Sequence, residues 1–193
     1  MITQITGRLI EKTPTYVVIE CNGIGYMIHI SLQTYSLVDG ESCKLFTHLS
    51  VKEDSHTLYG FFNQDERHLF RNLVSVSGVG PSTAQIILST YNTAEIISYI
   101  TSADVAAIQH VKGIGAKTAQ RIIIDLKDKV AKGMPTSDIL FQKDNTIKEE
   151  SLSALLALGF AKKGAEQKID KVLKENPEIT SIEDLVKMAL SQM

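Results

Sequence analysis

The sequence lacks the features that mark membrane-spanning, secreted and metal-binding proteins. Its 193 residues contain no run of about 18 apolar side chains, so we expect no segment that crosses a membrane. The start, MITQITGRLIEK, has neither the basic beginning nor the long apolar stretch of a secretory signal, which favours a cytoplasmic protein. The five histidines form no metal-ligand spacing, and Cys21 and Cys43 each lie in an apolar stretch. We therefore expect no bound metal and two reduced cysteines in the core.

Motifs that bind nucleotides are missing as well. A P-loop needs the pattern Gly-x-x-x-x-Gly-Lys-Ser/Thr, which occurs nowhere in the chain. A dinucleotide fingerprint needs a third glycine, where Thr83 or Thr118 stands, and a strand before it. The segments before both positions are predicted to be helical, so neither condition holds. We expect no cofactor and no ATP-driven motor in this chain.

Positive charge is concentrated in the middle of the chain. The whole chain has a formal net charge of −2, but residues 63–133 contain eight Lys and Arg against six Asp and Glu. Residues 1–62 contain four against six, and residues 134–193 contain eight against ten. A polyanion would therefore be attracted to the middle segment. A solvated helix face would explain such a run of cations equally well.

Residues 1–62 are predicted to form a small β-barrel. Short stretches rich in β-branched and aromatic residues are separated by turn sequences such as Asn22–Gly23 and Asp39–Gly40. About five short strands in such a length suit a closed or nearly closed barrel of the OB type. The predicted strands are Ile2–Ile10, Tyr16–Cys21, Gly25–Ile30, Cys43–Val51 and Thr57–Phe62.

Residues 63–130 are predicted to be helical, which makes the chain an α+β protein of several domains. Apolar residues recur at helical spacing, and Thr93 and Ser102 are predicted as N-caps. The longest helix should turn Ile122, Ile123, Leu126 and Val130 inward and Arg121, Asp125 and Lys129 outward. The predicted helices are Gln64–Ser75, Ser82–Thr90, Thr93–Ile100, Ser102–His110 and Lys117–Val130.

The end of the chain is predicted to be a flexible linker, residues 131–145, followed by a three-helix bundle, residues 146–193. The linker prediction rests on its Gly, Pro, Ser and polar residues. Thr146 and Glu149 have the spacing of a capping box, and Gly159 suits a left-handed turn at a helix end. A bundle of this size needs nearly every large apolar residue inside, so Leu152, Leu155 and Leu156 are expected in its core.

An internal repeat is the most informative feature of the sequence. Residues 73–88, LVSVSGVGPSTAQIIL, align without gaps on residues 108–123, IQHVKGIGAKTAQRII, and seven of the sixteen positions are identical. Chance would give about one identity, so duplication is the better explanation. Each copy consists of an apolar helix end, Gly-apolar-Gly, and then a new helix.

This pattern predicts two sites that bind phosphate. Paired glycines permit a sharp turn and let an anion approach the backbone. The following helix starts at once, so its free N–H groups and positive dipole end point at that anion. Pro81 suits the first helical position, and Val79 and Ile114 can anchor the turns in the core. Such a grip on phosphates would ignore base sequence. A pair of tight helix–helix turns without a ligand is the alternative.

The order of these segments resembles the RuvA family of Holliday junction branch-migration subunits. The resemblance covers essentially the whole chain, and the similar segments are, in order, MITQITGRLIEK, NGIGYMIHI, THLSVKEDSHTLYGF, LVSVSGVGPSTA and VKGIGAKTAQRIIIDLKDK. The resemblance implies a non-catalytic homotetramer, acting singly or in pairs, that holds a four-way DNA junction open for branch migration in recombination and repair. It also implies a RuvB-like hexameric ATPase, bound somewhere within Thr146–Met193, and a RuvC-like junction resolvase as partners.

The resemblance also implies roles for particular residues. Glu53 and Asp54 match the acidic pin near the junction centre, where carboxylates would repel phosphates. From the residues alone, they form a solvated turn between two strands. Many members of the family have lysine where Ser82 and Ala116 stand, so affinity and salt dependence are expected to be lower here. The expected DNA contacts are Gly78, Val79, Gly80, Ser82, Thr83, Gly113, Ile114, Gly115, Lys117, Thr118 and Arg121.

Two alternatives remain open at the level of the sequence. Helix-hairpin-helix DNA glycosylases with lyase activity have a nucleophilic lysine where Lys117 stands. This chain offers no iron–sulfur cysteine cluster, and the helix expected to carry a partner Asp gives way to the Gly133–Ser137 segment. The second alternative is a protein-interaction scaffold whose turns only look like DNA-binding hairpins.

Overall fold

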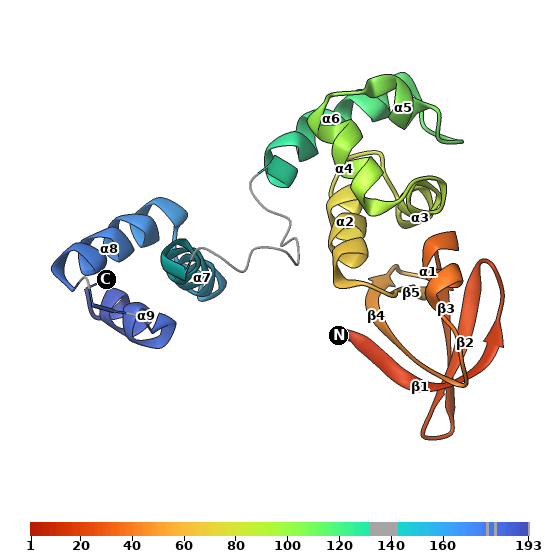
Figure 1. The fold of residues 1–193 in the computed structure, drawn as a ribbon, viewed down its shortest axis with the longest axis horizontal. Helices are drawn as coiled ribbons and strands as arrows, with labels where there is room; N and C mark the ends of the chain where they lie inside the picture. The colour runs from red at the N-terminus through yellow and green to blue at the C-terminus, as the bar shows by residue number, and fades with distance from the viewer. Residues whose placement is uncertain (132–142, 177, 180, 193) are drawn as a thin grey trace. The chain divides into compact units, whose positions relative to one another are not determined.

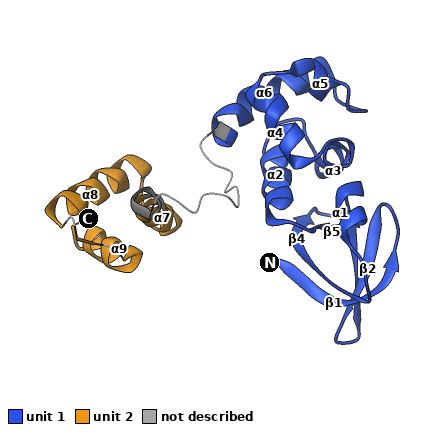
Figure 2. Ribbon diagram, in the orientation of Figure 1, with its two compact units in different colours: residues 1–136 blue, residues 137–193 orange. Residues whose placement is uncertain are grey.

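The computed structural model describes residues 1–131, 143–176, 178–179 and 181–192. The chain divides into two compact units, residues 1–136 and 137–193, which Figure 2 shows in blue and orange. Unit 1 contains the strands and the helices up to Ala131, and the described residues of unit 2 are mainly helical. No helix in the described part of the chain is long and apolar enough to cross a membrane.

The first part of unit 1 is a closed five-stranded barrel, which confirms the predicted fold of this region. The strands follow one another in the order β1–β2–β3–β5–β4, and β4 pairs with β1 to close the barrel (Figure 1). β3 and β5 pair in parallel, whereas the other neighbours are antiparallel. The strands are β1 (Gln4–Lys12), β2 (Tyr16–Cys21), β3 (Ile24–Ile30), β4 (Ser42–Val51) and β5 (His56–Phe61).

Alternating apolar side chains fill the barrel. Val17 and Ile19 on β2 and Ile28 and Ile30 on β3 are buried, because every second residue of a strand points to the same face. Cys43 on β4 is also buried, as expected, and this burial raises the pKa of its thiol. The expectation for the other cysteine was wrong: Cys21 ends β2 and is only half-buried.

A short helix that the sequence did not predict, α1 (Leu32–Leu37), follows β3. Ser31 is its N-cap, and the Ser31 hydroxyl accepts a hydrogen bond from the Thr34 amide at 3.0 Å. The helix has only six residues, too few to show an apolar period. Its cap is formed by a residue that directly follows a strand, so the local sequence resembles a loop.

The second part of unit 1 consists of helices, as predicted, but several helix starts differ. Asn92, not Thr93, caps α4 and forms a capping box with Glu95. Asp104, not Ser102, caps α5, which is therefore shorter than expected. The helices are α2 (Gln64–Val74), α3 (Pro81–Thr90), α4 (Thr93–Thr101), α5 (Val105–Gln109) and α6 (Ala116–Ala131).

One apolar core extends through these helices and reaches the barrel. Phe70 of α2 is fully buried, and its ring lies 5.1 Å from that of Tyr59 and 4.9 Å from that of Phe61, both on β5. The predicted inward face of α6 is confirmed, since Ile122, Ile123, Leu126 and Val130 are all buried. The barrel and the helices of unit 1 therefore share packed side chains.

Unit 2 is a small bundle of α7 (Lys143–Ala157), α8 (Lys162–Glu175) and α9 (Ile182–Ser191) around Leu155 and Ile169. Gly159 has a φ of +95° after α7, as its position predicted. Thr146 lies inside α7, so the expected capping box with Glu149 was wrong.

Two further expectations for the end of the chain need correction. Leu155 is buried and Leu152 packs against the core, but Leu156 is exposed. Of the expected linker, residue 131 belongs to α6 and residues 143–145 belong to α7, while residues 132–142 lie outside the described part of the chain.

Candidate nucleic-acid interface

The two copies of the sequence repeat form two turns between helices. Hairpin 1, residues 75–82, joins α2 to α3, and hairpin 2, residues 110–117, joins α5 to α6. In each hairpin the last turn of the entering helix contains an apolar residue of the shared core, Leu73 in α2 or Ile108 in α5. The repeat in the sequence is therefore a repeat in the structure.

The main-chain hydrogen bonds of the two turns correspond one to one. In hairpin 1, the amide of Val79 donates to the carbonyl of Val76 at 3.0 Å. In hairpin 2, the amide of Ile114 donates to the carbonyl of Val111 at 3.1 Å. The Val79 and Ile114 side chains are buried, so these residues anchor the turns in the core as predicted.

The first glycine of each pair is needed for its backbone conformation. Gly78 has a φ of +92° and Gly113 a φ of +88°, a left-handed region in which a β-carbon is strained. The second glycines, Gly80 and Gly115, do not have a positive φ, so their role is different. Among the described residues, a β-carbon placed on either of them would meet no heavy atom within 4 Å.

Open space therefore lies in front of the two helix starts. In α3 the first helical hydrogen bond runs from the Ala84 amide to the Gly80 carbonyl at 2.9 Å, so the amides of Ser82 and Thr83 precede it. In α6 the corresponding bond is 3.0 Å long, from Ala119 to Gly115. Amides ahead of the first helical bond have no carbonyl partner within the helix and can bind an anion.

The charges of the two hairpins differ sharply. Residues 73–88 contain no charged side chain, whereas the aligned residues 108–123 contain Lys112, Lys117 and Arg121. All three of these cations are exposed. Hairpin 1 offers an anion its amides and the hydroxyls of Ser82 and Thr83, and hairpin 2 adds positive charge.

Two cations of α6 reach across to hairpin 1. A guanidinium nitrogen of Arg121 donates to the carbonyl of Ser77 at 3.2 Å, and Lys129 donates to the hydroxyl of Ser75 at 3.2 Å. The sequence predicted both cations to point outward, and both are exposed, but it missed Ser75 and Ser77 as their acceptors. The absence of charge from hairpin 1 was the available signal that a neighbouring helix supplies its cation.

The remaining predicted site residues lie in unit 1 but on a different element. Glu53 and Asp54 are exposed in the turn between β4 and β5, which the Lys52 amide closes by donating to the Ser55 carbonyl at 2.8 Å. This confirms the polar turn that the sequence predicted. Contact of these carboxylates, or of the hairpin residues, with DNA stays a prediction.

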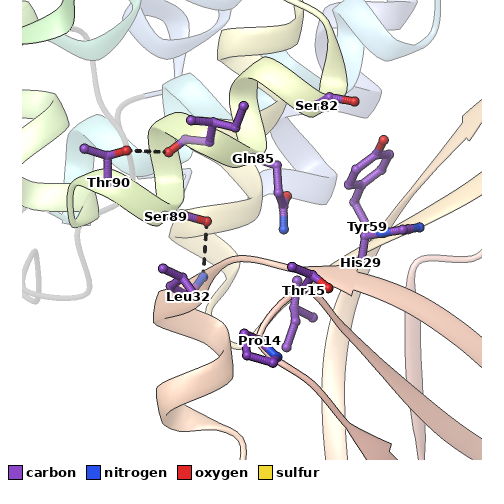
Figure 3. Close-up of a pocket in the computed structure, with 11 residues that line it drawn as sticks. Pro14, Thr15, His29, Leu32, Tyr59, Ser82, Gln85, Ser89 and Thr90 are labelled. Carbon is purple, nitrogen blue, oxygen red and sulfur yellow. Dashed lines mark hydrogen bonds between the residues drawn. The ribbon is translucent and has the colours of Figure 1, made fainter. Parts of the chain in front are cut away.

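A pocket of about 480 Å³ lies beside hairpin 1, between the barrel and α3 (Figure 3). The barrel contributes His29 and Tyr59, and α3 contributes Ser82, Gln85 and Ile86. Both polar atoms of the Gln85 amide are buried without a hydrogen-bond partner in the described part of the chain. The two parts of unit 1 are thus not tightly packed at this place.

Three protein families match the chain, in the order of its segments. The RuvA N-terminal domain matches residues 1–60, a SAM-like helix-hairpin-helix tandem matches residues 70–128, and the RuvA C-terminal domain matches residues 146–193. The middle match covers both hairpins, so the tandem is recognised as a unit.

Curated relatives match over the full length. A protein of Christiangramia forsetii named Holliday junction branch migration complex subunit RuvA is 57% identical over 194 residues, with 100% of both chains covered. Proteins of the same name from Flavobacterium psychrophilum and Bacteroides fragilis are 49% and 41% identical, again over 100% of both chains. The expectation of a non-catalytic subunit agrees with these relatives. The chain belongs to the RuvA family of Holliday junction branch migration complex subunits.

Proposed function

We propose that this protein binds four-way DNA junctions through their phosphates and holds them open as the non-catalytic subunit of a branch-migration complex. The observation that carries this proposal is the pair of hairpins with matching backbone geometry, each with open space in front of a helix start. Paired sites of this kind can hold neighbouring phosphates without reading bases. The relatives named above are subunits of such a complex.

Electrostatics support DNA as the ligand. Lys112, Lys117 and Arg121 lie on hairpin 2 or its helix, and Arg121 extends to hairpin 1. One contiguous basic region then serves both hairpins, in a chain whose total charge is negative. Glu53 and Asp54 would act in the opposite sense, because carboxylates next to phosphates disfavour intact duplex at the junction centre.

The division of the chain into two units suggests where a protein partner binds. We assign recruitment of a RuvB-like hexameric ATPase to unit 2, where the apolar side chains of Leu158, Phe160 and Leu190 are exposed although the bundle has a core of its own. A homotetramer would place four copies of the hairpins around one junction. A RuvC-like resolvase and a cytoplasmic location stay predictions from the sequence.

The central test compares a four-way junction with a linear duplex of equal length in a gel-shift experiment. We expect preferential binding of the junction, with affinity that falls as salt increases. Equal binding to both DNAs, or binding to neither, would contradict the proposal. Absence of binding to both DNAs is also the outcome expected of a protein-interaction scaffold.

Removal of residues 146–193 separates the two roles. Junction binding should survive, because unit 1 has its own core and contains both hairpins, while ATPase-driven migration should be lost. Loss of junction binding on this deletion would show that the units do not work independently.

The lyase alternative gains no support from the geometry. A nucleophilic lysine needs a low pKa and a pocket that encloses a base. Lys117 is exposed, and the surface depression that it lines with Asp125 is formed by α6 residues, with no second element of the described part of the chain around it. Borohydride treatment with abasic DNA is the decisive experiment: covalent capture through Lys117 would show lyase chemistry.

A further inference from the structure

We propose that Glu66 is a positioning residue that holds hairpin 1 at a set place relative to the acidic turn of Glu53 and Asp54. Glu66 lies in the first turn of α2, outside every predicted DNA contact, and the proposed function assigns it no task. It is nevertheless only 3% exposed. A buried carboxylate is costly unless its oxygens are satisfied, so its partners show what it does.

All of the hydroxyl partners of Glu66 belong to the barrel side of unit 1. The Thr34 hydroxyl donates to one carboxylate oxygen at 2.7 Å, and the Ser31 hydroxyl donates to the other. Ser31 is the N-cap of α1, and Thr34 is in its first turn. Burial raises the pKa of Glu66, and the hydrogen bonds from Ser31 and Thr34 act against this rise. The carboxylate therefore ties the start of α1 to α2.

The connection continues through α1 to the helix of hairpin 1. The Leu32 amide donates to the Ser89 hydroxyl of α3 at 3.2 Å (Figure 3), and the Gln33 side chain donates to the carbonyl of Tyr91 at the end of α3. The chain of contacts thus runs from Glu66 to α1, from α1 to α3, and along α3 to Gly80, its N-cap.

The pocket beside hairpin 1 makes this connection important. Where His29 and Tyr59 of the barrel face Gln85 and Ile86 of α3, the surfaces leave a space of about 480 Å³ instead of interlocking. Close packing resists relative movement, and a gap does not. α3 also packs against α2, but beside the pocket the α1 bridge is its link to the barrel, and Glu66 holds the other end of that bridge.

A fixed place for α3 matters because the two sites act on the same DNA. The acidic turn joins β4 to β5 of the barrel, while hairpin 1 joins α2 to α3. If α3 shifts against the barrel, hairpin 1 can still hold the phosphates of one arm of the DNA junction. The carboxylates of Glu53 and Asp54, however, no longer lie at the centre of the junction. Glu66 acts in this way only if the protein opens junctions, so this inference rests on the proposed function.

The test separates holding a junction from opening it. Full-length Glu66→Ala is compared with Asp65→Asn, which removes a negative charge from the same helix turn at a residue with no hydrogen bond or ion pair to α1 in the described part of the chain. Junction affinity is measured by gel shift, and central opening by the fluorescence of 2-aminopurine placed at the crossover, at saturating protein. We expect Glu66→Ala to reduce the opening signal by about tenfold and the affinity by no more than about threefold, as for loss of a charge-assisted network that orients a site. Asp65→Asn should match the wild type.

Two milder variants keep the test decisive if Glu66→Ala does not fold. Glu66→Gln keeps one acceptor oxygen, and Thr34→Val removes a donor from the other side, so both should show a partial loss of opening. Loss of affinity and opening by the same factor would indicate a merely structural role and overturn the proposal. Wild-type opening in all folded variants would also overturn it. Failure of the wild type to prefer or open junctions would instead refute the proposed function.

Discussion

Hairpin 1 and hairpin 2 have the same backbone but differ in charge and in what they pack against. The bond from Val79 to Val76 is 3.0 Å long and its equivalent from Ile114 to Val111 is 3.1 Å long, and the φ values of Gly78 and Gly113 are +92° and +88°. Hairpin 1 has no charged side chain of its own, whereas hairpin 2 has Lys112 and Lys117. The geometry shared by both copies is the part that we propose binds an anion through amides, and only hairpin 2 adds charged side chains of its own.

The second difference is mechanical. The helix that follows hairpin 1, α3, contacts α2 and also α1, which follows β3 of the barrel. The helix that follows hairpin 2, α6, has its main contacts with α4 and α5. Hairpin 1 is thus linked to the acidic turn, and hairpin 2 carries the cations. We therefore expect hairpin 1 to fix the position of the DNA relative to the acidic turn and hairpin 2 to attract its phosphates. Arg121 of α6 links the two copies through its hydrogen bond to Ser77.

The largest expected effect comes from blocking both hairpins at once. In Gly80→Leu with Gly115→Leu, the new side chains would occupy the open space in front of the helix starts. Neither glycine has a positive φ, so the fold should tolerate the change. Because the amides of both hairpins are covered, we expect junction affinity to fall by about a hundredfold or more in a gel shift, the equivalent of about 3 kcal/mol.

Gly164→Leu provides the matched control, since Gly164 also faces open space but lies in unit 2. This variant should bind junctions like the wild type. The single variants Gly80→Leu and Gly115→Leu then show how much each hairpin contributes to junction affinity. Near-equal losses from Gly80→Leu and Gly115→Leu would show that amides dominate both grips, whereas a loss confined to Gly115→Leu would show that charge decides.

A smaller effect is expected from the charge of hairpin 2. Lys117→Ala should weaken junction binding by about tenfold and reduce the slope of log affinity against log salt by about 1, because one phosphate contact is lost. Ser82→Ala, at hairpin 1, should leave the salt slope unchanged. Conversely, Ser82→Lys should increase the magnitude of the slope by about 1 and make hairpin 1 more like hairpin 2 in its salt dependence. An unchanged slope in Ser82→Lys would mean that no phosphate lies near α3.

Arg121 tests the link between the copies. If its guanidinium serves hairpin 1 through Ser77, Arg121→Ala should cost about threefold to tenfold in affinity in the wild type and in Gly115→Leu, as for one exposed charged contact. In Gly80→Leu, where hairpin 1 is already blocked, the same change should cost little. A cost of equal size in both glycine backgrounds would place Arg121 with hairpin 2 instead.

These contrasts also show which features a sequence can reveal. The barrel, the two turns and the buried Val79 and Ile114 were predictable because strand alternation, glycine pairs and apolar spacing are local patterns. Helix α1 was not predictable, since its six residues have no period and its N-cap is held by Glu66, which is 35 residues from Ser31 in the chain. The bond from Arg121 to Ser77 spans 44 residues and depends on how two similar helices pack. Local rules find the sites, and tertiary contacts decide how the sites are connected.

The smallest expected effect concerns the contribution of Glu66, which links α2 to α1, to the free energy of unfolding. Burial raises the pKa of Glu66 in the folded protein, so the folded state holds this proton more tightly than the unfolded chain does. The pH-dependent part of the Glu66 contribution to the free energy of unfolding is therefore fully present below the pKa of the unfolded chain and is lost as pH rises through the folded pKa. Glu66→Gln has no proton to lose, so the stability advantage of the wild type over this variant should shrink as pH rises from 4 to 8.

Urea unfolding of the two proteins across this range measures the difference, which should be of the order of 1 kcal/mol at the acidic end. Other titrating groups cancel because both proteins contain them, including His48, whose pKa is lowered by burial and by Arg71 and Arg67. Asp65→Asn serves as the control and should show no comparable trend. A wild-type advantage that grows with pH would mean that the ionised carboxylate gains more from Ser31 and Thr34 than it loses by burial, which would make the α1 bridge stronger at neutral pH than at acidic pH.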